Sequence, residues 1–180
     1  GHRTKNRTMN IVSMSWVRNE ADVIEAFVRH HCAFLDRMII IDHRSGDNTG
    51  DILRKLKEEG LPLDIRFDDS FVYRQGEALT AVLHELRNEA PDIVIPLDAD
   101  EFLQTDTKLT VRQELEQLQQ NTVTIIPWRT YIPMPEDDAT EPNVLRRILH
   151  RKITESPQWY KVIIPGTLLK QNVILPIGSH

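Results

Sequence analysis

A short apolar stretch that ends in three carboxylates constrains the fold of this chain more than any other feature. Residues 93–97 read Ile-Val-Ile-Pro-Leu, and Asp98, Asp100 and Glu101 follow immediately. Because the stretch is apolar throughout and rich in β-branched residues, it is typical of a strand buried on both faces at the centre of a parallel sheet. Ligands of such sheets collect at the carboxyl ends of the strands. The sequence therefore predicts a functional site at residues 98–101.

Asp98 and Asp100 also have a plainer interpretation. Most acidic tripeptides are solvated turns that cap the next element. Two carboxylates spaced two residues apart can instead hold one divalent cation between protein and substrate oxygens. The rest of the chain has to distinguish these interpretations.

Strand and helix patterns alternate three times before residue 98, which predicts right-handed crossovers and a parallel sheet. The predicted strands are residues 10–16, 37–42, 63–67 and 93–97, and the predicted helices are residues 20–35, 51–59 and 74–88. Beyond residue 103 we expect a helix at 109–119 and a strand at 122–128. Further strands, expected to be antiparallel, follow at 144–151 and 161–164, and then a turn with a short last strand at 166–174. The expected fold is an α/β, Rossmann-like mixed sheet with a parallel amino-terminal half and helices on both faces.

Composition excludes several classes of protein. A length of 180 residues suits one domain, and a formal net charge of −5 argues against a nucleic-acid-binding protein, which would normally carry a basic face. Cys32 is the single cysteine, so no internal disulfide forms, and a cytoplasmic location is the default expectation. No apolar run approaches the roughly 20 residues that span a bilayer.

Three aspartates stand at equivalent places in the predicted sheet. Asp42, Asp69 and Asp98 each lie at or just beyond the carboxyl end of a predicted parallel strand. A turn or a helix cap explains any one of them, but it makes their coincidence an accident. A shared rim of carboxylates suits a nucleotide, since carboxylates accept hydrogen bonds from base and ribose while a cation offsets their repulsion against the diphosphate.

Four segments resemble the glycosyltransferases of the GT-A fold that use nucleotide-diphospho-sugars, most closely the family 2-like branch. The resemblance covers roughly the first 100 residues and is specific as a set. The four segments are Val17-Arg18-Asn19-Glu20, the run from Ile39 to Thr49 with its Asp-x-x-Ser-x-Asp-x-Thr loop, Arg74-Gln75-Gly76-Glu77-Ala78, and the run from Leu97 to Leu103 with its Asp-x-Asp motif.

This resemblance implies roles for individual residues. Asp42 would hydrogen-bond the base or ribose, Asp98 the ribose, and Asp100 a Mn²⁺ or Mg²⁺ ion. Asp98 and His180 are further metal candidates, and base candidates for the acceptor proton lie at Glu136, Asp137 and Asp138, where a solvated loop is the commoner explanation. The remaining residues expected to bind the nucleotide are Asn19, Glu20, Asp69, Arg74 and Gln75.

The implied function is a metal-dependent, hexosyltransferase-like enzyme that moves a sugar from a nucleoside-diphosphate sugar, UDP-sugar above all, to a carbohydrate or other hydroxyl acceptor with inversion. A nucleotidyltransferase is an alternative, although residues 15–20 lack the expected glycine-rich phosphate loop. A nucleotide-sugar-binding fragment without turnover is another.

We expect residues 1–9 to be a tag remnant or disordered leader and residues 10–180 to be one domain. Residues 10–104 would form its nucleotide-binding half. Residues 105–180 would form its acceptor-side half, whose abrupt end at His180 is compatible with a truncated carboxyl terminus.

Overall fold

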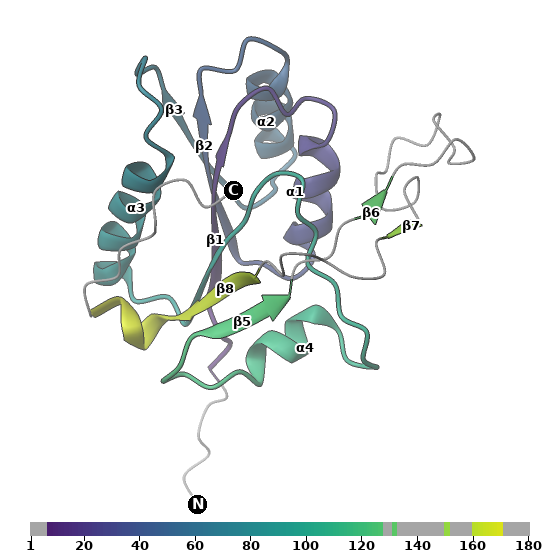
Figure 1. The fold of residues 1–180 in the computed structure, drawn as a ribbon, viewed down its shortest axis with the longest axis vertical. Coiled ribbons are helices and arrows are strands. Elements are labelled where there is room, and N and C mark those ends of the chain that lie inside the picture. The colour runs from purple at the N-terminus through teal and green to yellow at the C-terminus, as the bar shows by residue number, and fades with distance from the viewer. Residues whose placement is uncertain (1–6, 128–130, 133–149, 152–159, 171–180) are drawn as a thin grey trace, which may run out of the picture.

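The computed structural model describes residues 7–127, 131–132, 150–151 and 160–170. A six-stranded sheet runs through the described part of the chain, with helices packed on its faces (Figure 1). The elements in chain order are β1 (Ile11–Val17), α1 (Ile24–Cys32), β2 (Arg37–His43), α2 (Thr49–Glu58), β3 (Leu63–Asp68), α3 (Gln75–Glu89), β4 (Ile93–Pro96), α4 (Val111–Glu116), β5 (Thr124–Pro127), β6 (Tyr131–Ile132), β7 (His150–Arg151), β8 (Tyr160–Pro165) and a 3-10 helix, η1 (Gly166–Lys170).

The strand order is β3-β2-β1-β4-β8-β5. The first four strands pair in parallel, while β8 pairs antiparallel with both β4 and β5. This arrangement confirms the predicted mixed sheet with a parallel amino-terminal half. It also places β4, the apolar strand before the acidic motif, inside the sheet between β1 and β8.

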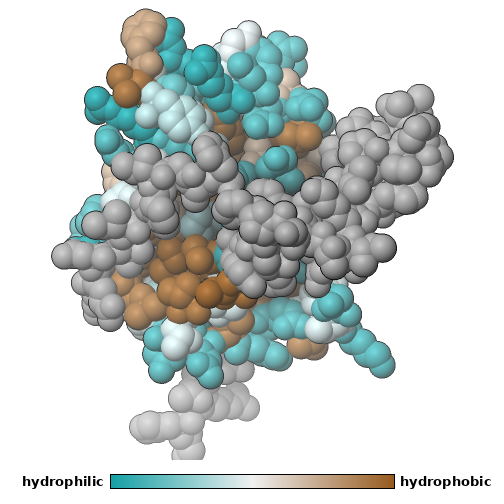
Figure 2. Space-filling view, viewed as in Figure 1, coloured by the Kyte–Doolittle hydropathy of each residue, from teal (hydrophilic) through white to brown (hydrophobic). Residues whose placement is uncertain are grey.

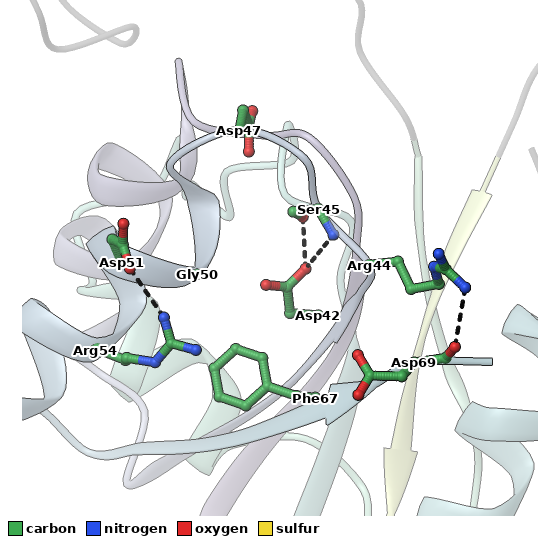
Figure 3. A pocket seen from close by; sticks show the side chains of 9 residues that line it. All are labelled: Asp42, Arg44, Ser45, Asp47, Gly50, Asp51, Arg54, Phe67 and Asp69. Carbon is green, nitrogen blue, oxygen red and sulfur yellow. Dashed lines mark hydrogen bonds and ion pairs between the residues drawn. The ribbon is translucent and has the colours of Figure 1, made fainter. Parts of the chain in front are cut away.

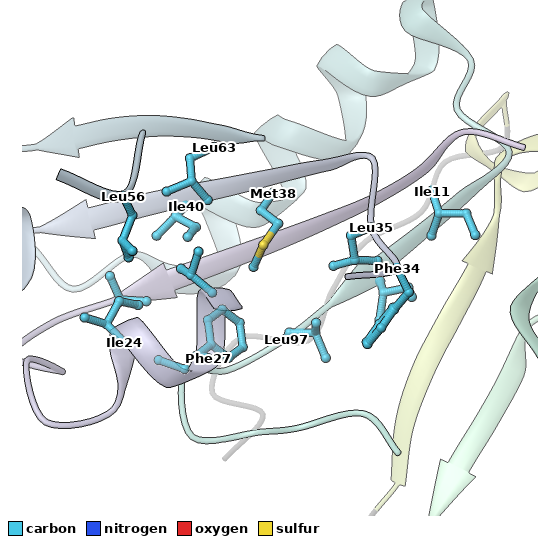
Figure 4. Packing of buried hydrophobic residues seen from close by; sticks show 14 of the residues in the cluster. Ile11, Ile24, Phe27, Phe34, Leu35, Met38, Ile40, Leu56, Leu63 and Leu97 are labelled. Carbon is cyan, nitrogen blue, oxygen red and sulfur yellow. The ribbon is translucent and has the colours of Figure 1, made fainter. Parts of the chain in front are cut away.

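Two apolar layers enclose the sheet. On one face, residues of α1 and α2 pack with alternate residues of the strands, including Phe27, Leu56 and Ile40 (Figure 4). On the other face, Leu79, Val82, Leu83 and Leu86 of α3 pack against Met14 and its neighbours. The alternation arises because successive strand residues point to opposite faces, and since both faces are covered, β1 is buried along its whole length.

The starts of α1 and α2 differ from the predicted positions. α1 begins at Ile24 rather than residue 20, because Asn19 has a positive φ of 53° and the amides of Val23 and Ile24 both donate to the carbonyl of Glu20, forming a separate turn. α2 begins at Thr49, two residues earlier than predicted. There the carboxylate of Asp47 accepts a hydrogen bond from the Thr49 amide and satisfies one of the free donors of the first turn.

In the carboxyl-terminal half, α4 and β5 are shorter than predicted, whereas β8 spans Tyr160–Pro165 rather than 161–164. The helix expected at 109–119 spans Val111–Glu116, and β5 covers only part of 122–128. Within the expected strand at 144–151, the structure describes β7, which pairs with β6. The first part of the expected turn at 166–174 is η1, and the last strand expected there lies outside the described residues.

Gly166 joins β8 to η1 beside the start of β4. Its amide donates to the carbonyl of Asp92 at 2.8 Å, and a Cβ at this position would lie 1.6 Å from the carbonyl oxygen of Pro91. Only glycine permits this close approach of two backbones. The contact fixes the end of β8 against β4.

The surface differs between the two ends of the sheet. Figure 2 shows mainly hydrophilic residues at the top of the view, where α2 and the ends of β2 and β3 lie, and a hydrophobic area over β8. Among the helices of the described residues, none is both long enough and apolar enough to cross a membrane.

Candidate functional site

The candidate site lies at the carboxyl ends of the parallel strands. Asp42 pairs with Val17 of β1 and with Phe67 of β3, near the last residue of each strand. Asp69 follows β3 directly, and Asp98 stands two residues beyond β4. Because these strands are parallel, the three aspartates share one rim of the sheet, as the sequence predicted.

Asp42 is buried, and its two carboxylate oxygens have different surroundings. Oδ1 accepts hydrogen bonds from the Ser45 hydroxyl at 2.5 Å and the Ser45 amide at 3.3 Å. Oδ2 points toward Gly50, where an added Cβ would lie 3.1 Å from it (Figure 3). One oxygen is therefore held by the protein, while the other faces a pocket.

This pocket has a volume of about 290 Å³ and combines carboxylates, guanidinium groups and one aromatic ring. The guanidinium of Arg54 lies 4.5 Å from the centroid of the Phe67 ring and 2.9 Å from the Asp51 carboxylate. The pocket therefore offers a flat apolar wall beside hydrogen-bonding groups of both charges. Its lining residues are Asp42, Arg44, Ser45, Asp47, Gly50, Asp51, Arg54, Phe67 and Asp69 (Figure 3).

A second, more open hollow of about 530 Å³ adjoins this pocket, and Arg44, Ser45 and Asp69 line both. The Arg44 guanidinium lies 3.6 Å from the centroid of the Phe71 ring and donates to the carbonyl of Asp69 at 3.2 Å. These contacts join the loop after β2 to the loop after β3. The two loops thus form a continuous wall.

The loop after β1 is bonded to the loop after β2. The side-chain oxygen of Asn19 accepts a hydrogen bond from the Gly46 amide at 2.7 Å, and the backbone amide of Asn19 donates to the Ser45 hydroxyl at 2.9 Å. The Glu20 amide donates to the hydroxyl of Thr49 at 2.9 Å. Asn19, predicted to bind the nucleotide, therefore uses its side chain to support the loop that holds Asp42.

Two carboxylates of the acidic motif after β4 form ion pairs with a lysine of β8. Nζ of Lys161, from β8, lies 3.1 Å from Asp98 and 3.0 Å from Glu101. The Glu101 carboxylate also accepts a hydrogen bond from the backbone amide of Asp98 at 2.6 Å. Burial and the charge of Asp98 raise the pKa of Glu101 to about 7, against the opposing effect of Lys161.

Asp100 and Glu20 share the electrostatic environment of this motif. Asp100 is exposed as a residue, yet partial burial of its carboxyl and the neighbouring charge of Asp98 raise its pKa. The pKa of Glu20 is raised to about 7, first by burial and then by the charges of Asp100, Asp22, Asp98 and Asp47. Carboxylates that raise one another's pKa in this way favour binding of a cation between them.

The donor set fits a hard divalent cation. Mg²⁺ and Mn²⁺ prefer oxygen ligands, and Mg²⁺ commonly takes one or two carboxylates from the protein and its other ligands from substrate phosphates and water. Asp98 and Asp100 supply two carboxylates. No group of three or more histidine, cysteine or acidic side chains able to hold a metal occurs within the described residues.

The other predicted site residues fall into two groups. Arg74 and Gln75 lie at the start of α3, where Arg74 is 3.8 Å from Glu77 and Gln75 accepts from the Tyr73 hydroxyl. The second group lies outside the described residues: Glu136, Asp137, Asp138 and His180.

Several residues at this rim were not identified from the sequence. Lys161 does not lie in a recognisable sequence motif. It reaches the acidic motif because its strand, β8, pairs antiparallel with β4. Ser45 was visible in the Asp-x-x-Ser pattern, but its bond to Asp42 was not. Arg54 and Phe67 have no sequence signal as pocket residues, since one lies on a helix and the other at the end of a strand.

Comparison with solved structures returns proteins of low identity. The mannosyltransferase PcManGT from Pyrobaculum calidifontis, solved with GDP-Man and Mn²⁺, is 21% identical with a TM-score of 0.47, covering 61% of this chain and 31% of that one. Glucosyl-3-phosphoglycerate synthase from Mycobacterium tuberculosis, solved with Mn²⁺, UDP and phosphoglyceric acid, is 21% identical with a TM-score of 0.40, covering 52% and 34%. The aligned part thus spans about a third of either enzyme.

A 4-diphosphocytidyl-2C-methyl-D-erythritol synthase is 10% identical with a TM-score of 0.44, covering 90% of this chain and 77% of that one. No curated protein sequence matches the chain significantly.

A family model matches most of the chain. The model for glycosyl transferase family 2 aligns with residues 16–168, a range that contains the Asp42 pocket, the acidic motif and Lys161. The chain belongs to glycosyltransferase family 2.

Proposed function

We propose that this chain is the nucleotide-sugar-binding part of a metal-dependent glycosyltransferase that transfers a hexose from a UDP-sugar to a hydroxyl acceptor. The observation that carries the proposal is the shared rim, with a base-sized pocket at Asp42 and a pair of carboxylates at Asp98 and Asp100. A nucleoside diphosphate has the matching order of groups: a base at one end and a diphosphate at the other.

The surroundings of Asp42 favour binding of a base that has a single imide N–H group. Oδ1 is occupied by Ser45, so Oδ2 alone can accept a hydrogen bond from a ligand. Uracil presents one N–H on its pairing edge, whereas guanine presents N1–H and N2–H side by side and would use both oxygens of a carboxylate. The flat face of Phe67 adds a stacking surface.

The acidic motif would hold the diphosphate end. Asp98 and Asp100 would bind a Mn²⁺ or Mg²⁺ ion, which when bound stabilises the charge of the departing diphosphate. Lys161 holds Asp98 and Glu101 together and adds positive charge on the same side. Hydrogen bonds from Asn19 and Glu20 join the loop after β1 to the loop after β2 and its helix. These bonds would hold the pocket that binds the base in a fixed position.

Inversion at the anomeric carbon is part of the proposal. An acceptor hydroxyl would then attack from the side opposite the diphosphate, and a carboxylate would accept its proton. The candidates for this carboxylate remain Glu136, Asp137 and Asp138.

The test is binding followed by product analysis. Thermal shifts of the 180-residue chain should be largest with UDP and Mn²⁺ together, because a ligand at a hundredfold excess over its dissociation constant stabilises by about 2.7 kcal/mol. Incubation with a UDP-sugar and a hydroxyl acceptor should release UDP as the sugar passes to the acceptor oxygen, whereas a nucleotidyltransferase would release pyrophosphate from UTP and a sugar phosphate. A protein that binds UDP-sugar and releases neither would be a binding module, and absence of metal-dependent nucleotide binding would contradict the proposal.

A further inference from the structure

Two neighbouring histidines of α1 bind the backbone of the same residue, Leu103. Nε2 of His30 lies 2.6 Å from the carbonyl oxygen of Leu103, and Nε2 of His31 lies 3.2 Å from the Leu103 amide nitrogen. Both backbone groups of Leu103, three positions beyond Asp100, are therefore held by side chains 72 and 73 residues away. From the sequence alone neither histidine had a context that suggested a role.

The hydrogen bonds determine the protonation of both rings. Nδ1 of His31 lies 2.8 Å from the carbonyl of Phe27, so Nδ1 carries the proton and Nε2 accepts from the Leu103 amide. Burial lowers the pKa of His31 to about 3, so the ring stays neutral and keeps this acceptor. His30 must donate from Nε2, because a carbonyl oxygen can only accept.

Aromatic packing fixes the same segment. The ring of Phe102 stacks on His31, with centroids 5.9 Å apart and an interplanar angle of 27°, and meets His30 and Phe27 edge-on. Hydrophobic packing alone would be met by phenylalanine or leucine at positions 30 and 31. The two hydrogen bonds to Leu103 add direction, because they specify where its backbone amide and its backbone carbonyl lie.

The start of the same turn is held from the sheet. The Leu97 amide donates to the carbonyl of Met14 at 3.0 Å, and the amide of Glu101 donates to the carbonyl of Asp98 at 3.0 Å. Residues 98–103 thus leave β4 at one anchor and reach α1 at the other. Asp100 lies between these anchors, so its position depends on both.

We propose that His30 and His31 are positioning residues that hold Leu103 and thereby fix the turn carrying Asp100 in the orientation that a divalent cation requires. This role rests on the proposed function, in which Asp100 is a metal ligand. Residues that orient a metal ligand without touching the metal typically account for about 10- to 100-fold in metal affinity or activity. The histidines contact the segment after Asp100 from α1, whereas Lys161 contacts Asp98 and Glu101 from β8.

Two substitutions of His31 form a matched pair. The amide group of asparagine reaches about as far as Nδ1, so His31→Asn keeps the bond to Phe27 and loses the bond to Leu103. The amide group of glutamine reaches about as far as Nε2, so His31→Gln keeps an acceptor for the Leu103 amide. At the half-buried position 30, His30→Gln likewise keeps the donor to the Leu103 carbonyl, and His30→Leu removes it at similar volume.

Three measurements on the full 180-residue chain separate positioning from stability: UDP affinity with and without Mn²⁺ by calorimetry, hydrogen exchange of the Leu103 amide by NMR, and the melting temperature. For His31→Asn and His30→Leu we expect faster exchange at Leu103 and a loss of about tenfold in the Mn²⁺-dependent gain in UDP affinity. UDP affinity in chelator should stay at the wild-type value, since the base pocket is untouched. The glutamine variants should recover most of the Mn²⁺-dependent gain.

Each outcome is decisive. If the asparagine and leucine variants keep the full Mn²⁺-dependent gain, or if all four variants lose it in proportion to their melting temperatures, the histidines are packing residues and the inference is overturned. The wild type distinguishes this result from a failure of the proposed function. If it shows no Mn²⁺-dependent UDP binding at all, the metal site itself is refuted, and the positioning role with it.

Discussion

Nζ of Lys161 lies 3.1 Å from Oδ2 of Asp98, although 63 positions separate the two residues. The bond joins β8, an antiparallel strand of the carboxyl-terminal half, to the motif that follows the parallel strand β4. Burial alone would lower the pKa of Lys161, but Glu101 and Asp98 raise it, so the ammonium stays charged. A positive charge therefore already lies beside the carboxylates that we propose as metal ligands.

Lys161→Met should have opposite effects on stability and on metal binding. Removing the ammonium leaves Asp98 and Glu101 partly buried without a cation, so we expect a loss of about 1–3 kcal/mol in the free energy of unfolding. The same change removes repulsion of Mn²⁺ and should strengthen metal binding. Urea unfolding and Mn²⁺ calorimetry measure the two effects, with Lys161→Arg as the charge-preserving control. Unchanged or weaker Mn²⁺ binding would show that Lys161 does not compete with the metal.

Asp42→Asn should change which base the pocket prefers. The Ser45 amide and hydroxyl donate to Oδ1, so the asparagine carbonyl should take that place and its NH₂ group should face the pocket. A donor there opposes the N3–H of uracil and matches the N3 acceptor of cytosine. We expect UDP to lose about 1.5–3 kcal/mol of binding free energy and CDP to gain relative to it. Calorimetry with UDP, CDP and GDP tests this, and an unchanged order of affinities would contradict the role of Asp42.

Gly50→Ala should separate stability from nucleotide binding. Gly50 lies in the first turn of α2, where alanine gains up to about 1 kcal/mol of helix propensity. The new methyl would lie 3.1 Å from Oδ2 of Asp42 and 3.5 Å from the Phe67 ring, within the pocket wall. We expect a melting temperature close to that of the wild type and at least tenfold weaker UDP binding. Equal UDP affinity would place the base elsewhere.

Stability should depend on pH through Glu20 and Glu101. Each has a folded-state pKa raised to about 7 from an ordinary value of 4.5, so the folded state binds protons more tightly than the unfolded state. Their contribution to stability is complete below about pH 4.5 and is lost as the pH rises through 7. Glu20→Gln should flatten this decline, and Mn²⁺ should offset it near pH 7. Urea unfolding of the wild type and of Glu20→Gln from pH 4.5 to 8, with and without Mn²⁺, measures these effects. A free energy of unfolding that rises with pH across this range in both proteins would contradict the prediction.

The sequence predicted the parts of this molecule that depend on local pattern. The strand–helix alternation up to Asp98 predicted the parallel pairing of the amino-terminal strands, because right-handed crossovers join parallel strands. The order of the strands in the sheet was not predicted. The rim of Asp42, Asp69 and Asp98 follows from the same geometry, since all three stand where parallel strands end. The predicted start of α1 at residue 20 was wrong, because Asn19 has a positive φ and is bonded to Ser45 and Gly46 of a distant loop. The local sequence pattern does not show these bonds.

Contacts between distant segments could not be predicted in this way. Lys161 meets Asp98 only because β8 pairs antiparallel with β4, and no spacing in the sequence encodes that register. His30 is half-buried and bonded to the carbonyl of Leu103, 73 positions away, and nothing in the sequence around it indicates this contact. Such side chains have no periodic signal, since what covers them comes from elsewhere in the chain.

The difference between Asp100 and Asp98 gives the sharpest test of the metal proposal. Asp100→Asn keeps the shape of the turn but removes an anionic oxygen that a hard cation prefers. Turnover should collapse, and UDP binding should lose its dependence on Mn²⁺, settling at the wild-type value measured in chelator because the Asp42 pocket is intact. Asp98→Asn should keep more of the metal dependence if its main partners are the ribose and Lys161.

The measurement is UDP affinity with and without Mn²⁺ for the wild type and both variants. His84→Asn, a substitution on α3 away from the rim, serves as a control for substitution itself. If Asp100→Asn retains the full Mn²⁺-dependent gain, the carboxylate is a turn residue, and the diphosphate must be held by groups other than the Asp-x-Asp pair.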